Sequence, residues 1–227
     1  MLSVIVPAYN AKDFLEQTIA SLFKTTKNDF ELIIIDDFSP DLRVKKFIQE
    51  LNSPQVRITK IFNIEHKWTN YNWNLGVQLA QGEYIAILNS DITLSKDWDT
   101  YLMGLLKTST IACPTEKGKG HLDPVIAKID PNMIKGACFM FKKEDIGKLF
   151  PIPPVLKHWC GDNILADRAN QVRGVSFCDE AIIQHFASSS AKTIDPTLYK
   201  RRILHDLESY HRLSDRNMKV IIDSITF

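Results

Sequence analysis

The sequence predicts an α/β protein built on a Rossmann-like, mostly parallel central sheet with helices on both faces. Two observations predict this fold class. Apolar runs typical of strands alternate with segments of helical periodicity through the first 110 residues. The run "FELIIID" at residues 30–36 is also continuously apolar rather than alternating, as in strands that are covered on both faces. A chain with this alternation winds its helices over each face of a parallel sheet.

The elements of the first half follow in a regular order. Strands are expected at residues 2–7, 30–36, 56–62 and 82–87, and helices between them at residues 11–26, 42–51 and 70–81. The first helix is the clearest, because Leu15, Ile19 and Leu22 recur at helical spacing. After the fourth strand, Ser95 is expected to cap a further helix whose first turn holds Asp97 and Asp99.

The second half is less regular. Its expected elements are a long mobile loop at 115–132, a strand passing into a short helix at 133–145, a helix that starts at Gly161–Asp162, two short strands at 174–178 and 181–186, and one or two amphipathic helices from 196 to 227. We therefore expect one domain over residues 1–195, followed by a helical extension over 196–227.

Composition narrows the class of protein. Lys and Arg number 28 against 27 Asp and Glu, so the chain carries no global field that would attract nucleic acid. The four cysteines form no Cys-x-x-Cys pair and are expected to be reduced, buried thiols of a cytoplasmic protein. No apolar run approaches the roughly 20 residues of a membrane span, and the first residues do not read as a signal peptide. Peripheral membrane contact stays open.

Ligands of such sheets bind beyond the carboxyl ends of the strands. Here those ends read "PAYN", "DDFSPD", "FNIEH" and "NSD", at residues 7–10, 36–41, 62–66 and 89–91. Asp and Asn suit a base, a ribose and a bridging cation better than a direct phosphate cradle. No Gly-x-Gly-x-x-Gly follows the first strand, and neither a P-loop nor a Gly-x-Ser-x-Gly elbow is present. These absences argue against a dinucleotide-dependent dehydrogenase, a P-loop NTPase and an α/β-hydrolase.

The segments "SVIVPAYN", "FELIIIDDFSPD", "NLGVQLAQGEYIAILNSDITLSKDW", "GACFMFKKED", "GDNILADRA" and "IIQHFASSS" together resemble the inverting family 2 glycosyltransferases with the GT-A fold. The resemblance implies transfer from a nucleotide-diphosphate sugar, expected to be a UDP- or dTDP-sugar, to a hydroxyl of a glycan, lipid-linked or protein acceptor. It also implies Mn²⁺ or Mg²⁺ as cofactor, with residues 1–110 binding the nucleotide sugar and 111–195 the acceptor. Nucleic acid as partner is disfavoured by the charge balance and is left open.

The resemblance assigns roles to particular residues. It implies Asp162 as the base that deprotonates the acceptor, and Asp91, the last position of the family's Asp-x-Asp motif, as a metal ligand. His185 matches a histidine that ligates metal in some relatives. The implied donor-binding residues are Pro7, Ala8, Tyr9, Asp36, Asp37, Asn74, Asn89, Ser90 and Asp91.

Two departures from the family pattern keep other functions open. Asn89 stands where the first Asp of Asp-x-Asp is expected, and Gly161 where a Glu usually precedes Asp162. A non-catalytic nucleotide-sugar binding module is therefore one alternative. A sugar nucleotidyltransferase is another, although "PAYNAKD" lacks the Gly-rich basic loop that it would need. Structural roles also compete at single residues: a turn for Asp37, a helix cap for Asp162 and a strand hydrogen bond for His185.

Overall fold

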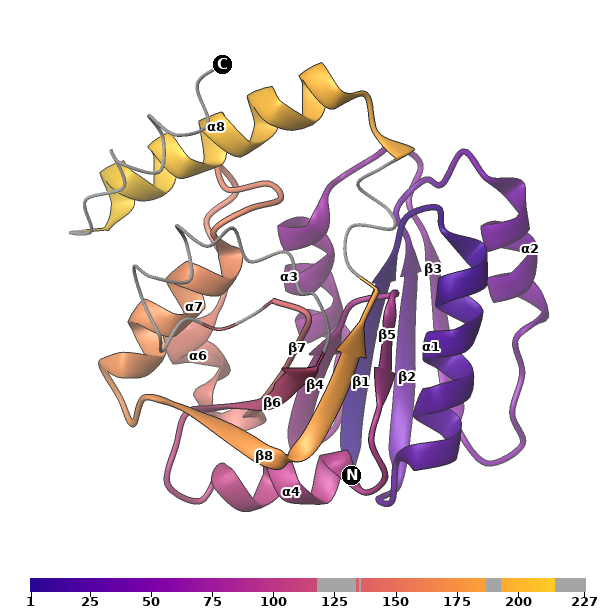
Figure 1. Cartoon of the computed structure of the whole chain (residues 1–227), viewed down its shortest axis with the longest axis vertical. Helices are drawn as coiled ribbons and strands as arrows, with labels where there is room; N and C mark the ends of the chain where they lie inside the picture. The colour runs from indigo at the N-terminus through magenta and orange to yellow at the C-terminus, as the bar shows by residue number, and fades with distance from the viewer. Residues whose placement is uncertain (118–133, 135, 187–192, 215–227) are drawn as a thin grey trace.

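The computed structural model describes residues 1–117, 134, 136–186 and 193–214. In this part of the chain an eight-stranded mixed sheet runs in the order β3-β2-β1-β4-β7-β6-β8-β5. The chain begins at the base of the sheet in Figure 1, and helix α8 crosses above it, beyond the carboxyl end of β1. The predicted fold class is confirmed.

The first half follows the predicted alternation. Its elements are β1 (Leu2–Ala8), α1 (Lys12–Thr25), β2 (Phe30–Asp36), α2 (Leu42–Glu50), β3 (Arg57–Phe62), α3 (Thr69–Leu79) and β4 (Tyr84–Leu88). Strand β1 pairs in parallel with β2 and β4, and β2 pairs in parallel with β3. The carboxyl ends of these four strands therefore meet at one edge of the sheet, where ligands of parallel sheets bind.

The second half adds antiparallel pairs. Its elements are β5 (Ile92–Leu94), α4 (Trp98–Leu105), β6 (Ile111–Lys117), β7 (Cys138–Lys142), a 3₁₀ turn (Lys143–Asp145) leading into α6 (Ile146–Leu149), α7 (Gly161–Asn170), β8 (Val175–His185) and α8 (Pro196–Leu213). Strand β7 is antiparallel to β4 and β6, and β5 is antiparallel to β8. Strands β6 and β8 are parallel.

Several boundary predictions were wrong in this half. Strands β5 and β6 were not predicted, and residues 115–117 belong to β6 rather than to a loop. Residues 118–132 of that predicted loop, and 215–227 of the predicted tail, lie outside the described residues. The two strands expected at 174–178 and 181–186 form one strand, β8, whose register against β6 shifts between Pro114 and Thr115. That irregularity interrupts the apolar pattern and explains the error.

Ser95 does not cap α4. The residue at the N-cap position of α4 is Asp97, in the left-handed conformation with φ 58°. The Ser95 hydroxyl instead accepts a hydrogen bond from the Ile182 amide (2.9 Å), and the Ser95 amide donates to the Ile182 carbonyl (2.8 Å). Pairing with β8 therefore continues past β5, and tertiary contact overrides the local capping signal.

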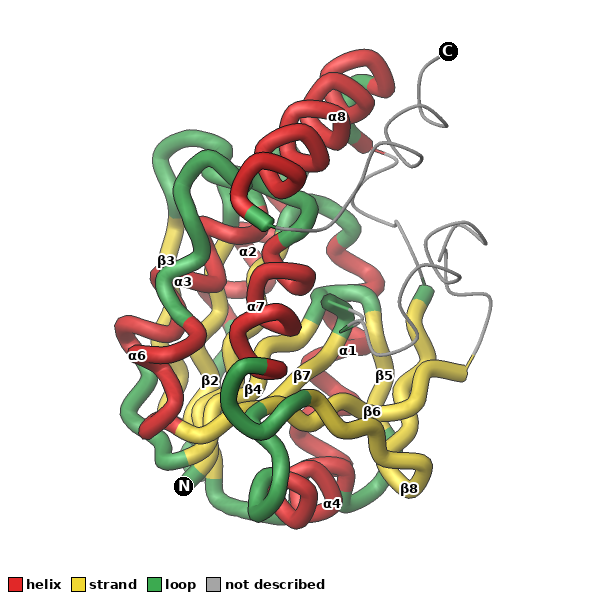
Figure 2. The backbone as a smooth tube through the Cα atoms, turned by 90° about the vertical axis from the view of Figure 1, so that its left-hand side faces the viewer, coloured by secondary structure: helices red, strands yellow, loops and turns green. Residues whose placement is uncertain are grey.

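The core lies in two layers, one on each face of the sheet. Helices α1, α2 and α4 cover one face with side chains such as Leu15, Val44 and Trp98. Helices α3, α6, α7 and α8 cover the other. Figure 2 shows α7 directly below α8, and Tyr210 of α8 donates a 2.6 Å hydrogen bond to Asp167 of α7. Helix α8 thus packs into the same core as the sheet. No helix in the described ranges is long and apolar enough to cross a bilayer.

Candidate functional site

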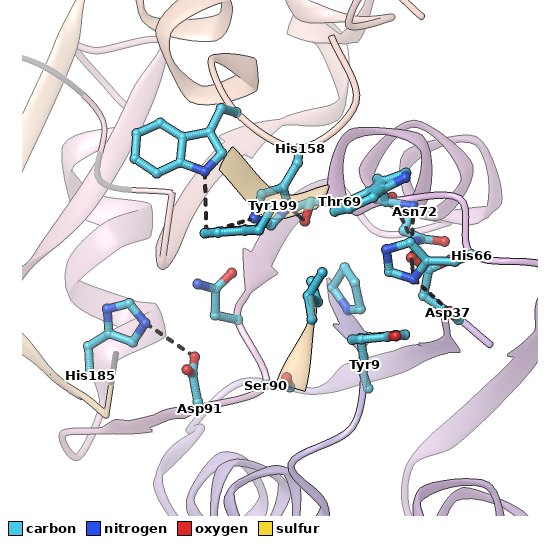
Figure 3. A pocket seen from close by; sticks show the side chains of 16 residues that line it. Tyr9, Asp37, His66, Thr69, Asn72, Ser90, Asp91, His158, His185 and Tyr199 are labelled. Atoms are coloured by element: carbon cyan, nitrogen blue, oxygen red, sulfur yellow. Dashed lines mark hydrogen bonds and ion pairs between the residues drawn. The ribbon is translucent and has the colours of Figure 1, made fainter. Parts of the chain in front are cut away.

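A cavity of ≈ 280 Å³ opens at the carboxyl ends of β1, β2 and β4. It is lined by Pro7, Ala8, Tyr9, Asp37, His66, Trp68, Thr69, Asn72, Asn89, Ser90, Asp91, His158, Trp159, His185, Ile194 and Tyr199. Asp91 and His185 lie at one end of the cavity in Figure 3, and Asp37 and His66 at the other. The cavity therefore brings together Pro7, Ala8, Tyr9, Asp37, Asn89, Ser90, Asp91 and His185 of the predicted site.

Asp37 organises the loop that follows β3. Its carboxylate accepts hydrogen bonds from the Asn63 side chain (2.7 Å) and from the Lys67 and Trp68 amides (both 2.8 Å). These bonds hold Trp68 in an unusual backbone conformation with φ 73°. Asp37 therefore contributes both a wall of the cavity and the shape of its neighbouring loop.

Asp36, the adjacent predicted residue, turns elsewhere. Its carboxyl accepts from the Ser39 amide (3.0 Å), and burial raises its pKa above the ordinary value. It does not line the cavity. Successive residues of a strand point to opposite faces, which separates Asp36 from Asp37.

Aromatic and imidazole rings form one wall of the cavity. Tyr9 packs edge-on against His66, and His66 against Trp68, each with centroids 4.3 Å apart. Trp68 then contacts His158 (5.6 Å), and His158 contacts Tyr199 (5.4 Å). Such a wall suits a flat ring, because aromatic side chains pack well against planar groups. A nucleobase is a ligand of this kind.

His158 enters this wall as a neutral ring. Burial lowers its pKa to about 4, so the imidazole is uncharged at neutral pH. Its Nδ1 lies 2.7 Å from the Thr69 hydroxyl and its Nε2 3.3 Å from the Tyr199 hydroxyl. The ring is therefore fixed from α3 on one side and from α8 on the other.

Helix α8 also fixes the backbone of this wall, a role that sequence reasoning missed. Asp206 is fully buried, and its carboxylate accepts from the amides of Lys157 (3.2 Å), His158 (2.8 Å) and Trp159 (3.0 Å). One carboxylate that accepts three consecutive amides holds a turn firmly. Nearly fifty residues separate the partners, so no local pattern in the sequence predicts this contact.

The other end of the cavity holds a carboxylate–imidazole–carboxylate chain. His185 Nε2 lies 3.2 Å from Asp91 Oδ1, and His185 Nδ1 lies 3.2 Å from Glu116 Oε1. Burial opposes the imidazolium charge, but the hydrogen bonds to Asp91 and Glu116 prevail and raise the pKa of His185 to about 9. Glu116 was not among the predicted site residues.

The facing atoms of Asp91 and His185 have the spacing that a divalent cation requires of two neighbouring ligands. Bonds of about 2.1 Å place two neighbouring ligand atoms of an octahedral ion about 3.0 Å apart, close to the spacing of a hydrogen-bonded pair. The facing atoms of Asp91 and His185 are 3.2 Å apart, so both can reach one ion once Nε2 has lost its proton. Among the described residues no group of three or more His, Cys, Asp and Glu side chains is arranged to hold a metal alone. Further ligands would come from a bound diphosphate or water.

Asp162 is not among the residues that line the cavity. It occupies the first turn of α7, while Cys160 stands at the N-cap position. Burial raises the pKa of Asp162 to about 6, against the opposing effect of hydrogen bonds from the Asn163 (3.0 Å) and Gly136 amides. The next residue, Ala137, accepts from the Asn89 amide (2.8 Å), so one short segment connects Asp162 to the Asn89–Asp91 strand end.

Asn74 is held away from the cavity. Its amide group exchanges two 2.9 Å hydrogen bonds with the backbone of Ile152. Gly161 also has a packing explanation. A Cβ at this position would lie 2.1 Å from the Oδ1 of Asn70, whose Nδ2 donates to the Leu156 (3.1 Å) and Trp159 (3.2 Å) carbonyls. Asn70 therefore fills the space beside Gly161.

Comparison with known proteins identifies the family. Residues 3–148 match the profile of glycosyl transferase family 2. This match covers more than half of the chain, which therefore belongs to glycosyl transferase family 2.

Two curated relatives illustrate the range within the family. The chain is 34% identical over 97 residues to TuaG of Bacillus subtilis, named for teichuronic acid biosynthesis, covering 43% of this chain and 38% of TuaG. It is 31% identical over 150 residues to the GalNAc(5)-diNAcBac-PP-undecaprenol β-1,3-glucosyltransferase of Campylobacter jejuni, covering 66% of this chain and 41% of that protein. The chain thus spans about two fifths of the length of these relatives.

Solved structures support the GT-A fold. The mannosyltransferase PcManGT of Pyrobaculum calidifontis, in complex with GDP-Man and Mn²⁺, superposes with a TM-score of 0.70 at 15% identity, covering 98% of this chain and 68% of PcManGT. GalNAc-T7 with UDP, GalNAc and Mn²⁺ gives 0.66 at 18% identity, covering 90% of this chain and 47% of GalNAc-T7. At such identities the likeness establishes the fold alone.

Proposed function

We propose that this chain transfers a sugar from a nucleotide-diphosphate donor to an acceptor hydroxyl with inversion at the anomeric carbon. One observation carries the proposal. The facing pair Asp91–His185 and the aromatic wall lie at opposite ends of one cavity, which opens at the carboxyl ends of parallel strands. This arrangement suits a ligand with a flat ring at one end and a diphosphate at the other.

Different residues of the cavity bind different parts of the donor. Tyr9, His66 and Trp68 pack against the nucleobase, while Asn89 and Ser90 offer hydrogen bonds to the ribose or sugar. Asp91 and His185 would hold the divalent cation, which when bound neutralises charge on the leaving diphosphate. Mn²⁺ is favoured over Mg²⁺ because one of the two side-chain ligands is an imidazole.

Asp162 is the proposed base. With a pKa of about 6 it is mostly ionised at pH 7 and basic enough to accept the proton of an acceptor hydroxyl as that oxygen attacks. The oxygen forms its bond to the anomeric carbon on the face opposite the nucleotide. The bond between that carbon and the diphosphate oxygen breaks with its electron pair, and the configuration inverts.

The ligands and names of similar proteins indicate which donors and acceptors to test first. GDP-Man accompanies PcManGT and UDP accompanies GalNAc-T7, each with Mn²⁺, so donors of this chemical class are the first to test. We keep UDP- and dTDP-sugars as the expected donors. The relative from Campylobacter jejuni is named for an undecaprenol-diphosphate glycan, which supports a glycan or lipid-linked acceptor.

The test is a thermal-shift screen of nucleotide sugars with and without Mn²⁺, followed by assay of nucleoside diphosphate release. A donor present at 100 times its Kd should add about 2.7 kcal/mol to the free energy of unfolding. Asp162→Asn should keep donor binding and lose transfer. Unchanged transfer by this variant would overturn the assignment of the base.

A non-catalytic nucleotide-sugar binding module gives a different result in the same experiment. It would show the donor-dependent thermal shift but no metal-dependent release of nucleoside diphosphate in any acceptor mixture. Release that requires both Mn²⁺ and Asp162 supports the enzyme and contradicts the binding module. The absence of any thermal shift with the whole donor panel would contradict both.

A further inference from the structure

Glu116 lies behind the candidate metal ligand His185. It is in β6, its side chain is only 5% exposed, and its Oε1 is 3.2 Å from His185 Nδ1. The opposite nitrogen of the same ring, Nε2, faces Asp91. No family pattern in the sequence pointed to Glu116, because it stands in a strand that was not predicted.

The pairing of the strands brings these residues together. Glu116 is in register with Ile183 across the parallel β6–β8 pair, and His185 follows two residues later on the same face of β8. His185 itself is in register with Ile92 of β5, the residue after Asp91. Three strands therefore fix the order Asp91, His185, Glu116 across the sheet.

An imidazole binds a cation through one nitrogen and must carry its remaining proton on the other. A carboxylate that accepts from that second nitrogen selects the required tautomer, fixes the ring and makes the ligating nitrogen more basic. Glu116 is placed to accept from Nδ1–H, so Nε2, the nitrogen that faces Asp91, is the one that gives up its proton when a cation binds.

Glu116 cannot share an ion with Asp91 through the position seen here, because the two carboxylates contact opposite edges of one ring. We propose that Glu116 is a positioning residue, which orients His185 for the divalent cation without binding the cation itself. The inference rests on the proposed metal role of Asp91 and His185. The inference adds Glu116 to that site as the residue that orients the His185 ring.

The experiment measures Mn²⁺ affinity by electron paramagnetic resonance, with UDP and separately GDP present, and needs no turnover. Glu116→Ala should weaken Mn²⁺ binding about 10–100-fold, the usual effect of losing such a partner. Glu116→Gln keeps an oxygen that accepts from Nδ1–H, so it should restore most of the affinity. Thr115→Val is the matched control, since it removes only the exposed 2.9 Å hydrogen bond to Asp179 between the same two strands. It should leave Mn²⁺ affinity unchanged.

A double-mutant cycle separates positioning from direct ligation. If Glu116 acts through His185, Glu116→Ala should cause no further loss in a His185→Ala protein. An equal loss in both backgrounds would make Glu116 an independent ligand and overturn the inference. Retention of wild-type affinity by Glu116→Ala, while His185→Ala loses it, would also overturn it. If Asp91→Ala and His185→Ala both bind Mn²⁺ as tightly as the wild type, the proposed metal site itself fails.

Discussion

Replacing Asp162 by Asn should make the protein more stable at neutral pH while it removes the proposed base. The pKa of Asp162 is raised from 3.8 to about 6, chiefly by burial. Because one pKa unit corresponds to about 1.4 kcal/mol, ionisation of this group costs the folded state up to about 3 kcal/mol. Asn has nearly the same shape and keeps an oxygen that can accept from the Asn163 amide, so it removes the charge without removing that bond.

The sign and the pH range follow from proton linkage. Between pH 3.8 and about 6 the folded state holds this proton more tightly than the unfolded state does, so the free energy of unfolding falls as pH rises. The cost is fully present above pH 6 and absent well below pH 3.8. We expect Asp162→Asn to gain about 3 kcal/mol at pH 7.5 but only about 1 kcal/mol at pH 4.5.

Urea unfolding of both proteins at these two pH values measures the difference. For a chain of this size 3 kcal/mol is also roughly 6–12 °C in Tm. Asp13→Asn is the matched control, since Asp13 lies in the first turn of α1 but is 71% exposed, and it should change stability by less than about 0.5 kcal/mol. A destabilised Asp162→Asn at pH 7.5, or a gain that does not shrink at pH 4.5, would refute the reasoning.

Three further predictions concern the cavity and its supports. Asp91→Ala should weaken nucleotide binding about tenfold in the presence of Mn²⁺ and leave metal-free binding unchanged, as titration calorimetry would reveal. Gly161→Ala should cost about 1–3 kcal/mol in urea unfolding, because its Cβ would meet Asn70 at 2.1 Å, and the same change should cost less when it is made in an Asn70→Ala protein. Asp206→Ala should lower nucleotide affinity about tenfold, or 1.4 kcal/mol, whereas Asp195→Ala, which removes the side-chain cap of α8, should lower stability alone.

The first half of the fold was predictable because its signals are local. Each strand from β1 to β4 is an apolar run, and the helices between them carry their apolar residues at helical spacing. The position of the cavity could be predicted from the same pattern, since the carboxyl ends of parallel strands meet at one edge of the sheet. Pro7, Tyr9 and Asp91 could therefore be assigned to one place from the order of the strands alone.

The second half depends on contacts that no local pattern encodes. Strand β5 has only three residues, and β8 continues through a register shift against β6. The partners of His158 come from α3 and α8, and those of His185 from the turn between β4 and β5 and from the end of β6. Glu116 and Asp206 were missed for this reason. For Asn74 the sequence showed its position in a motif but not the two hydrogen bonds that its side chain makes with the Ile152 backbone.

The stability cost at Asp162 bears on whether this chain is an enzyme or a binding module. A binding module gains nothing from a half-buried carboxylate whose ionisation costs stability, and a neutral residue of the same shape, such as Asn, would relieve that cost. Strained or costly groups persist where the chemistry needs them. The departure at Gly161 does not weaken this argument, because Asn70 fills the adjacent space and ties α3 to the turn before α7. Asp206 fastens the same turn from α8. The surroundings of Asp162 are thus supported by two separate buried polar contacts, which is the pattern of a site under functional constraint and favours the transferase.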